Sequence, residues 1–469
     1  MDTGWRALIR GNNAASSAVV GGGMVLHAIN VFLVTTILPS VTRDIGGLRL
    51  FAWATTLYVA ASLFGGVMTA RLLHAIGTRS TYRLALTVFA AGSIGCALAP
   101  SMPVLLGGRL VQGLGSGTLS ALSFTQIRLL FPRPLWPRAV AVVSAMWGIA
   151  TLLGPAVGGM FAQADAWRAA FWSLAAITPL LGLLVERVLA RQPVAARSTA
   201  PVGMSWPNLL LLLGGVVAVS AGGTAAGFSA PVLVGLGLFC VLGFSWREQR
   251  GGLRVLPHGA TDPRTKLGAT YAAMVLILLA MTTEIFIPYL LQTLHFMAPL
   301  WAGYLSAILS GSWTTGSMTS SGFAGRRIGQ ALVAGPLMVA GGVACLAVLL
   351  PTMSGSPVLL FGIALSLMLM GLGIGTCWPH LAARVFAVAP ETEQALAAAS
   401  VTTITMLGNA YGTALGGVIA NQAGMADPGG TVGAQAAARA VFLAAILPPV
   451  VAALLTRRMQ PTPAPAASP

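Results

Sequence analysis

Charged side chains are scarce in this sequence, and acidic ones are the scarcest. Only 8% of the 469 residues are charged, and 10 Asp and Glu stand against 26 Lys and Arg. The chain is instead 56% hydrophobic, with a mean hydropathy of +0.84, which is more apolar surface than a soluble core needs. The net charge of +16 is spread over many short loops and forms no single basic face. No nucleic-acid partner is therefore expected.

Residues typical of catalytic and metal sites are few and scattered. The four cysteines lie in apolar segments without disulfide or zinc spacing, so they indicate small buried side chains. The five histidines form no helical His-x-x-x-His pair, and no Ser/His/Asp arrangement or P-loop stands out. These absences argue against an enzyme and against an ATP-driven pump. No metal and no other cofactor is expected.

Long apolar runs dominate what remains. Fourteen stretches are long and apolar enough to cross a membrane, so the sequence predicts an all-α polytopic membrane protein with 14 transmembrane helices. The expected spans are 17–39, 50–73, 81–99, 103–129, 138–161, 168–190, 207–224, 229–246, 267–293, 298–321, 330–350, 357–380, 395–421 and 436–456. The 57 glycines fit this class, because small residues let membrane helices approach closely.

The spans follow a six, two, six order. We expect a cytoplasmic segment at 1–16, a six-helix bundle at 17–190, a linker with two extra membrane helices at 191–265, a second six-helix bundle at 266–457 and a disordered tail at 458–469. Similar turns, 70–79 and 322–329, occupy the same place in each bundle, which indicates two homologous halves. Paired halves around a midplane site are the layout of alternating-access transporters.

The cations predict the orientation. With the N-terminus in the cytoplasm, 21 of the 26 Lys and Arg fall on the cytoplasmic side. Four fall outside, namely Arg43, Arg49, Arg168 and Arg439, and Arg109 lies within a span. This asymmetry is the positive-inside pattern. We therefore expect a multi-pass protein of the inner (cytoplasmic) membrane with both termini in the cytoplasm, and we interpret its first apolar segment as a retained helix.

Four motifs resemble those of one transporter family. The first span ends in Leu38-Pro39, a cytoplasmic loop runs from 70 to 79, the fourth span carries R-x-x-Q-G-x-G at 109–115, and the fifth carries G-x-x-x-x-x-G-P-x-x-G-G at 148–159. With these motifs the chain resembles the major facilitator superfamily, and most closely its fourteen-helix drug/proton antiporter branch. The resemblance implies a monomer that binds a small-molecule substrate and protons. It also implies conformational roles for Gly77, Arg79, Gly148, Gly154, Pro155, Gly158 and Gly159.

Two ionisable side chains lie deep in apolar spans, Arg109 and Glu284. Such residues cost about 2.5–3.5 kcal/mol on insertion scales and usually mark transport pathways or proton relays. The alternatives are a polar side chain packed against a neighbouring helix, or an arginine that snorkels to the interface. Burial favours the protonated form of a carboxyl group, so we expect Glu284 to carry the coupling proton, with Arg109 as a candidate partner. The resemblance implies a role for Arg109 in proton-linked conformational change.

Polar and aromatic residues near the middle of the spans predict a central cavity. Gln112 and Ser116 share a helix face with Arg109 by their spacing. The expected substrate-binding residues are His27, Asn30, Gln112, Trp147, Glu284 and Tyr289. Relatives in the branch usually carry an aspartate nine residues before the proline of the Leu-Pro pair, where this chain has Asn30. Because an asparagine cannot exchange a proton, the usual coupling scheme and a cationic substrate do not carry over directly.

Three functional hypotheses follow from this pattern. The first is proton-coupled efflux, by antiport, of a small amphipathic compound or drug, which would confer multidrug resistance. The second is transport of a specific anionic or siderophore-like metabolite, which a cavity with Arg109, His27 and few acids would suit. The third is an uncoupled receptor or scaffold on the same fold, which would move no solute.

Overall fold

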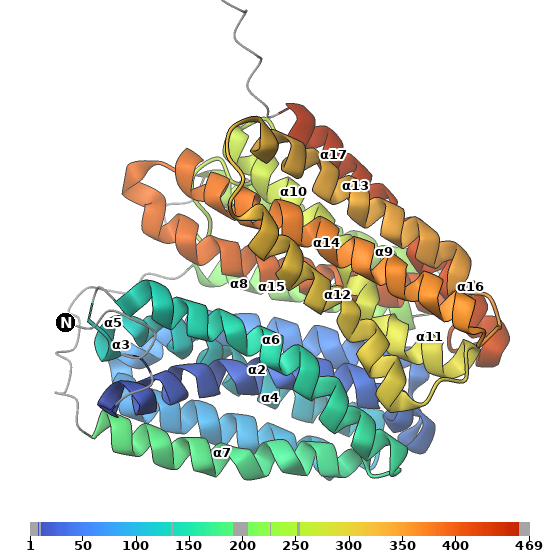
Figure 1. Cartoon of the computed structure of the whole chain (residues 1–469), viewed down its shortest axis with the longest axis horizontal. Coiled ribbons are helices and arrows are strands. Elements are labelled where there is room, and N and C mark those ends of the chain that lie inside the picture. Colours follow the sequence, from blue (N-terminus) through green and yellow to red (C-terminus); the bar gives the residue numbers. More distant parts are fainter. Residues whose placement is uncertain are drawn as a thin grey trace, which may run out of the picture.

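Every element in the described part of the chain is a helix (Figure 1). The computed structural model describes residue 8 and residues 11–132, 135–190, 205–225, 227–250 and 254–458. Most of the segment 1–16, the start of the linker and residues 459–469 of the expected disordered tail lie outside these residues, while Arg458 ends a helix. The expected all-α class is confirmed for the residues described.

Six helices and one short turn form the N-terminal bundle. They are α2 (Gly11–Ile45), the 3-10 turn η1 (Leu48–Leu50), α3 (Phe51–Ala97), α4 (Met102–Thr125), α5 (Ile127–Leu130), α6 (Trp136–Gln163) and α7 (Trp167–Leu189). Helix α3 contains two expected spans, and its backbone leaves the helical region at Gly77, where φ is 77° and ψ is 171°. Glycine adopts positive φ without steric cost, so Gly77 allows the sharp turn between the two halves of α3.

The inserted pair and the C-terminal bundle complete the chain. The pair consists of α8 (Trp206–Thr224) and α9 (Ser229–Arg250). The bundle consists of α10 (Lys266–Met281), η3 (Thr282–Phe286), α11 (Ile287–Leu294), α12 (Pro299–Ser320), α13 (Arg326–Leu349), α14 (Pro357–Val388), η4 (Glu391–Glu393), α15 (Gln394–Gln422), α16 (Gly430–Ala444) and α17 (Leu447–Arg458). In Figure 1 the N-terminal bundle lies below the C-terminal bundle.

The expected span 267–293 changes its winding at Glu284. It runs as α10, then as the 3-10 turn η3, then as α11. Pro288 has no N–H to donate to the carbonyl of Glu284, and that carbonyl accepts instead from the N–H of Ile287. The proline therefore accounts for the tighter turn that carries Glu284.

Ten helices of the described residues are long and apolar enough to cross a membrane. They include Leu48–Ala97 as one helix, where the sequence predicts two spans. The expected spans in α4, α12 and α15 are helical but are not among the ten. The chain is therefore a multi-pass membrane protein, while fourteen crossings remain a prediction.

The closest contacts between the two bundles gather at one end. Helix α6 packs on α12, and α3 packs on α15. The ring of Phe51 stacks on Phe286 with centroids 6.0 Å apart, and Arg49 pairs with Asp427 at 3.2 Å. From this end the ribbons of the two bundles diverge toward the end where α5 lies (Figure 1).

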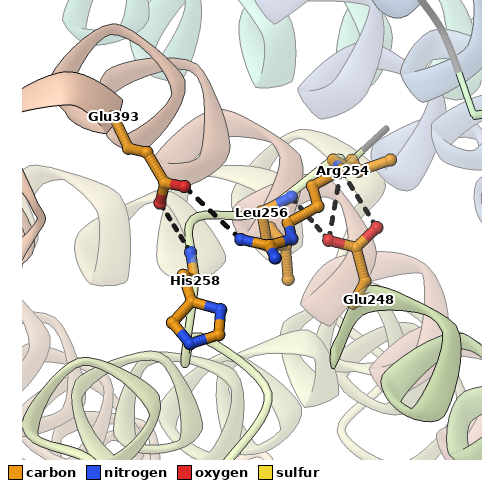
Figure 2. Close-up of polar contacts among 6 residues, drawn as sticks. Glu248, Arg254, Leu256, His258 and Glu393 are labelled. Carbon is orange, nitrogen blue, oxygen red and sulfur yellow. Dashed lines mark hydrogen bonds and ion pairs between the residues drawn. The ribbon is translucent and has the colours of Figure 1, made fainter. Parts of the chain in front are cut away.

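A buried carboxylate holds the loop that follows the inserted pair (Figure 2). Glu248, near the end of α9, is 4% exposed. It accepts hydrogen bonds from the backbone N–H groups of Val255 at 3.0 Å and Leu256 at 2.9 Å, and from the side chain of Asn208 on α8. These donors satisfy a carboxylate that has left water.

A second carboxylate connects this loop to the C-terminal bundle (Figure 2). Glu393, in the turn before α15, accepts from the backbone N–H of His258 at 2.7 Å and pairs with Arg254 at 3.4 Å. Farther along α15, the hydroxyl of Tyr411 donates to the carbonyl of Leu212 on α8 at 3.3 Å. The inserted pair is thus bonded to the C-terminal bundle both at its loop and along α8.

Candidate functional site

Arg109 lies in the interior of the N-terminal bundle and is 1% exposed. Its Nε donates to the carbonyl of Ala54 at 3.1 Å, and its Nη1 donates to Gln112 Oε1 at 2.6 Å and to Asn30 Oδ1. Gln112 in turn donates to Ser93 Oγ at 2.8 Å. The guanidinium is therefore held by neutral acceptors on α2, α3 and α4, which excludes the snorkelling alternative.

Asn30 provides one of these acceptors and leaves one donor without a partner. Its amide oxygen faces Arg109, so its Nδ2 points elsewhere, and Nδ2 has no hydrogen-bond partner among the described residues. A buried N–H without an acceptor costs about 1–3 kcal/mol. An aspartate in this place would pair with Arg109 and carry no such donor.

A second polar group adjoins the arginine. The hydroxyl of Tyr58 lies 2.5 Å from Ser116 Oγ and 3.2 Å from His27 Nδ1, and Ser116 Oγ lies 2.8 Å from His27 Nδ1. The Tyr58 ring also covers Arg109, whose Cζ is 4.0 Å from the ring centroid. His27 and Arg109 therefore belong to one network, joined by a tyrosine.

Trp147 on α6 is the exposed neighbour of this network. Its ring meets the ring of His27 edge-on, with centroids 5.8 Å apart, and is 39% exposed. The ring of Phe32 also meets it edge-on, with centroids 6.3 Å apart. A large ring that is partly open to its surroundings can offer an apolar face and an N–H to a ligand.

Glu284 and Tyr289 lie apart from this network. Glu284 is partly exposed in η3, and no described residue bonds to its carboxylate. Tyr289 packs on Phe51 with ring centroids 5.5 Å apart, near the end where the bundles meet. The structure therefore brings together His27, Asn30, Gln112 and Trp147 around Arg109. It does not pair Glu284 with Arg109, whose Nε and Nη1 donate to other residues.

The glycines of the fifth-span motif lie where α6 meets two other helices. A Cβ at Gly154 or Gly158 would lie 2.5 Å or 2.9 Å from atoms of Phe32 or Leu33 on α2. A Cβ at Gly159 would lie 2.5 Å from the Cα of Leu300 on α12, across the junction of the two bundles. Gly148, the first glycine of the motif, has no such neighbour within 4 Å.

Pro155 lies at the same junction. A Cβ at Gly303 of α12 would lie 2.9 Å from the Cβ of Pro155 and 2.9 Å from the Cγ2 of Thr36. The glycines of α6 and α12 therefore allow the backbones of α6, α2 and α12 to approach closely.

The loop motif lies at the opposite end of the N-terminal bundle. Arg79 and Arg83 both bond Glu186 on α7, with Arg83 Nε 2.5 Å from Glu186 Oε1. Both partners belong to the N-terminal bundle, so this charge cluster joins two of its helices. Gly77 provides the turn that precedes it.

Sequence reasoning missed Tyr58 and Ser93. Tyr58 lies in an apolar stretch of α3, and no spacing in the sequence relates it to His27 on α2 or Arg109 on α4. A signal was nevertheless present, because Tyr58 is the one tyrosine in the first seventy residues and falls in the middle of an expected span.

Solved structures of membrane transporters share this architecture. A peptide transporter in complex with sulfate aligns over 94% of this chain and 94% of its own, with a TM-score of 0.70 and 14% identity. A D-xylose-proton symporter aligns over 96% of this chain and 98% of its own, with a TM-score of 0.67 and 16% identity. At such low identity these likenesses show the fold, that of a polytopic membrane transporter.

Sequence comparisons show the family. The model described as Major Facilitator Superfamily matches residues 20–390. A relative from Mycobacterium tuberculosis (strain ATCC 25618 / H37Rv), named "Probable multidrug-efflux transporter Rv1634", is 36% identical over 459 residues, covering 94% of this chain and 93% of its own. The chain belongs to the Major Facilitator Superfamily, as its motifs predict.

Proposed function

We propose that this protein is a secondary active transporter that exports small amphipathic compounds, including drugs, in exchange for protons. The observation that carries the proposal is 36% identity, over nearly the whole chain, to a relative named for multidrug efflux. A second support is the buried Arg109, because a cation held deep in a membrane protein usually has a functional role. Transport follows alternating access between two bundles, with one chain as the working unit.

The proposed topology has fourteen crossings of the cytoplasmic membrane and both termini in the cytoplasm. The order of six helices, an inserted pair and six helices supports it, as does the distribution of cations along the sequence. In this orientation, the end at which α6 meets α12 faces outside. The structure then corresponds to a state in which the two bundles meet at their outer end and their helices diverge toward the cytoplasm.

In this proposal Glu284 exchanges the proton and Arg109 responds to it. Glu284 lies in a turn that Pro288 tightens, and no described residue bonds its carboxylate. It is therefore free to gain or lose a proton without breaking a bond of the fold. The substrate contacts Trp147 and the polar residues beside it, His27, Asn30 and Gln112, with Tyr289 on the other bundle.

A second candidate substrate class is supported by the partners of Arg109. Its acceptors are Asn30, Gln112 and the carbonyl of Ala54, all neutral. A cation that no carboxylate bonds among the described residues favours a substrate that carries its own negative charge. The protein would then transport an anionic metabolite, with the same fold and the same proton site.

Transport in proteoliposomes tests both candidates. Rhodamine 123 and fluorescein share a xanthene scaffold but are cationic and anionic, respectively. We expect an imposed pH gradient to drive accumulation of rhodamine 123. Accumulation of fluorescein alone would favour the anionic class. Movement of neither dye, nor of any compound in a drug panel, would contradict a transport function and leave the receptor or scaffold hypothesis.

A further inference from the structure

Tyr58 contacts both polar groups of the candidate site. It is fully buried on α3. One face of its ring covers the guanidinium of Arg109, and its hydroxyl reaches His27 and Ser116. No motif assigns it a role, yet it is the side chain through which Arg109 and His27 are connected.

The hydroxyl of Tyr58 takes part in the hydrogen bonding around His27 in either neutral tautomer. When Nδ1 carries no proton, Tyr58 donates to Ser116 and Ser116 donates to Nδ1. When Nδ1 carries the proton, it donates to Ser116, and Tyr58 can donate to the backbone carbonyl of His27, 3.3 Å away. A phenylalanine would remove a hydroxyl that both arrangements use.

The ring of Tyr58, unlike its hydroxyl, acts on Arg109. Arg109 is surrounded by neutral acceptors, and no carboxylate bonds it among the described residues. The negative face of an aromatic ring attracts a cation, and the attraction grows when water is excluded. The ring therefore helps to keep the guanidinium pointed at Asn30 and Gln112.

His27 connects the buried network to the exposed part of the site. Its ring stacks on Tyr58 with centroids 5.9 Å apart and meets Trp147 edge-on at 5.8 Å. A change in the His27 ring therefore changes what supports Trp147. Trp147 is the partly exposed aromatic residue to which the proposed function assigns substrate contact.

We propose that Tyr58 is a positioning residue of the substrate site: its ring holds Arg109, and its hydroxyl holds His27 and, through it, Trp147. This inference rests on the proposed function. The two parts of the Tyr58 side chain have different roles. The hydroxyl contributes to substrate affinity, and the ring contributes to turnover.

Two substitutions separate the parts. Tyr58→Phe keeps the ring and should raise the KM for rhodamine 123 about 2- to 12-fold, the loss of one hydrogen bond, with kcat within twofold of wild type. Ser116→Ala should act like it. Tyr58→Leu also removes the ring and should lower kcat roughly tenfold or more, the effect of a lost cation–π contact away from water. The matched control is Tyr82→Phe, because Tyr82 is also buried on α3 but its hydroxyl has no partner among the described residues.

A readout that needs no transport accompanies the kinetics. The ¹⁵N resonance of His27 Nδ1, assigned with His27→Gln, should shift in Tyr58→Phe and Ser116→Ala but not in Tyr82→Phe. The inference is overturned if Tyr58→Phe matches Tyr82→Phe in KM and in this resonance, or if Phe and Leu at position 58 lower kcat equally. If the wild-type protein moves no dye, the proposed function fails, and the resonance alone still decides whether Tyr58 positions His27.

Discussion

Gly159 controls how closely the two bundles meet in this state. A Cβ at this position would lie 2.5 Å from the Cα of Leu300, whereas ordinary contacts begin near 3.4 Å. Gly159→Ala should therefore push α6 and α12 apart by roughly an ångström, and overpacking of this kind costs about 1–3 kcal/mol. The other state of the cycle, in which this junction opens, bears no such cost. We expect the population to shift toward that state by about 5- to 140-fold.

Thiol labelling measures this shift. In a background without the four native cysteines, a cysteine in place of Thr36, which lies buried at the junction, should react faster with a membrane-impermeant reagent added outside when Gly159 is alanine. Gly148→Ala is the matched control, because it belongs to the same motif but has no neighbour within 4 Å. Equal labelling rates in the two variants would refute the argument that Gly159 sets the closure of this junction.

Three further predictions concern the loop, the arginine and the topology. Glu248→Ala should lower the melting temperature, because it leaves the N–H groups of Val255 and Leu256 without their acceptor at about 1–3 kcal/mol each, whereas Ala at the exposed Glu391 should leave it unchanged. Asn30→Asp should raise the melting temperature, because the new carboxylate would pair with Arg109. If Asn30→Asp raised the melting temperature equally in an Arg109→Gln background, this cause would be refuted. In intact cells, an impermeant reagent should label a cysteine at Met353 but not one at Gly322, and the reverse pattern would contradict the proposed orientation.

The sequence predicts much of the architecture because membrane helices leave a strong signal. Apolar runs give the helical class, and the glycines of the motif at 148–159 include three that lie at close helix contacts. The motif does not say which partner each glycine meets. Only packing shows that Gly159 faces Leu300 on the other bundle while Gly148 faces no close neighbour.

Part of the candidate site could likewise be predicted from the sequence, and part could not. Helical spacing relates Gln112 and Ser116 to Arg109. In the structure Gln112 bonds Arg109 directly, whereas Ser116 bonds Tyr58, whose ring covers Arg109. Contacts between helices distant in sequence have no such periodicity, which is why no spacing relates Tyr58 to His27 or Arg109. The expected pairing of Arg109 with Glu284 is not present in this state, because it would have to cross between bundles whose relative position no sequence pattern specifies.

In the proposed mechanism, Glu284 exchanges the proton that drives export. One proton moving down 100 mV releases ~2.3 kcal/mol, and one pH unit adds ~1.4 kcal/mol, which together sustain roughly a 500-fold gradient of a neutral solute. Glu284→Gln resembles the permanently protonated carboxyl group. The most direct measurement compares pH-driven accumulation with exchange of bound dye in proteoliposomes. We predict that Glu284→Gln abolishes accumulation and leaves binding intact. A variant that still concentrated dye with the wild-type pH dependence would rule out Glu284 as the proton carrier.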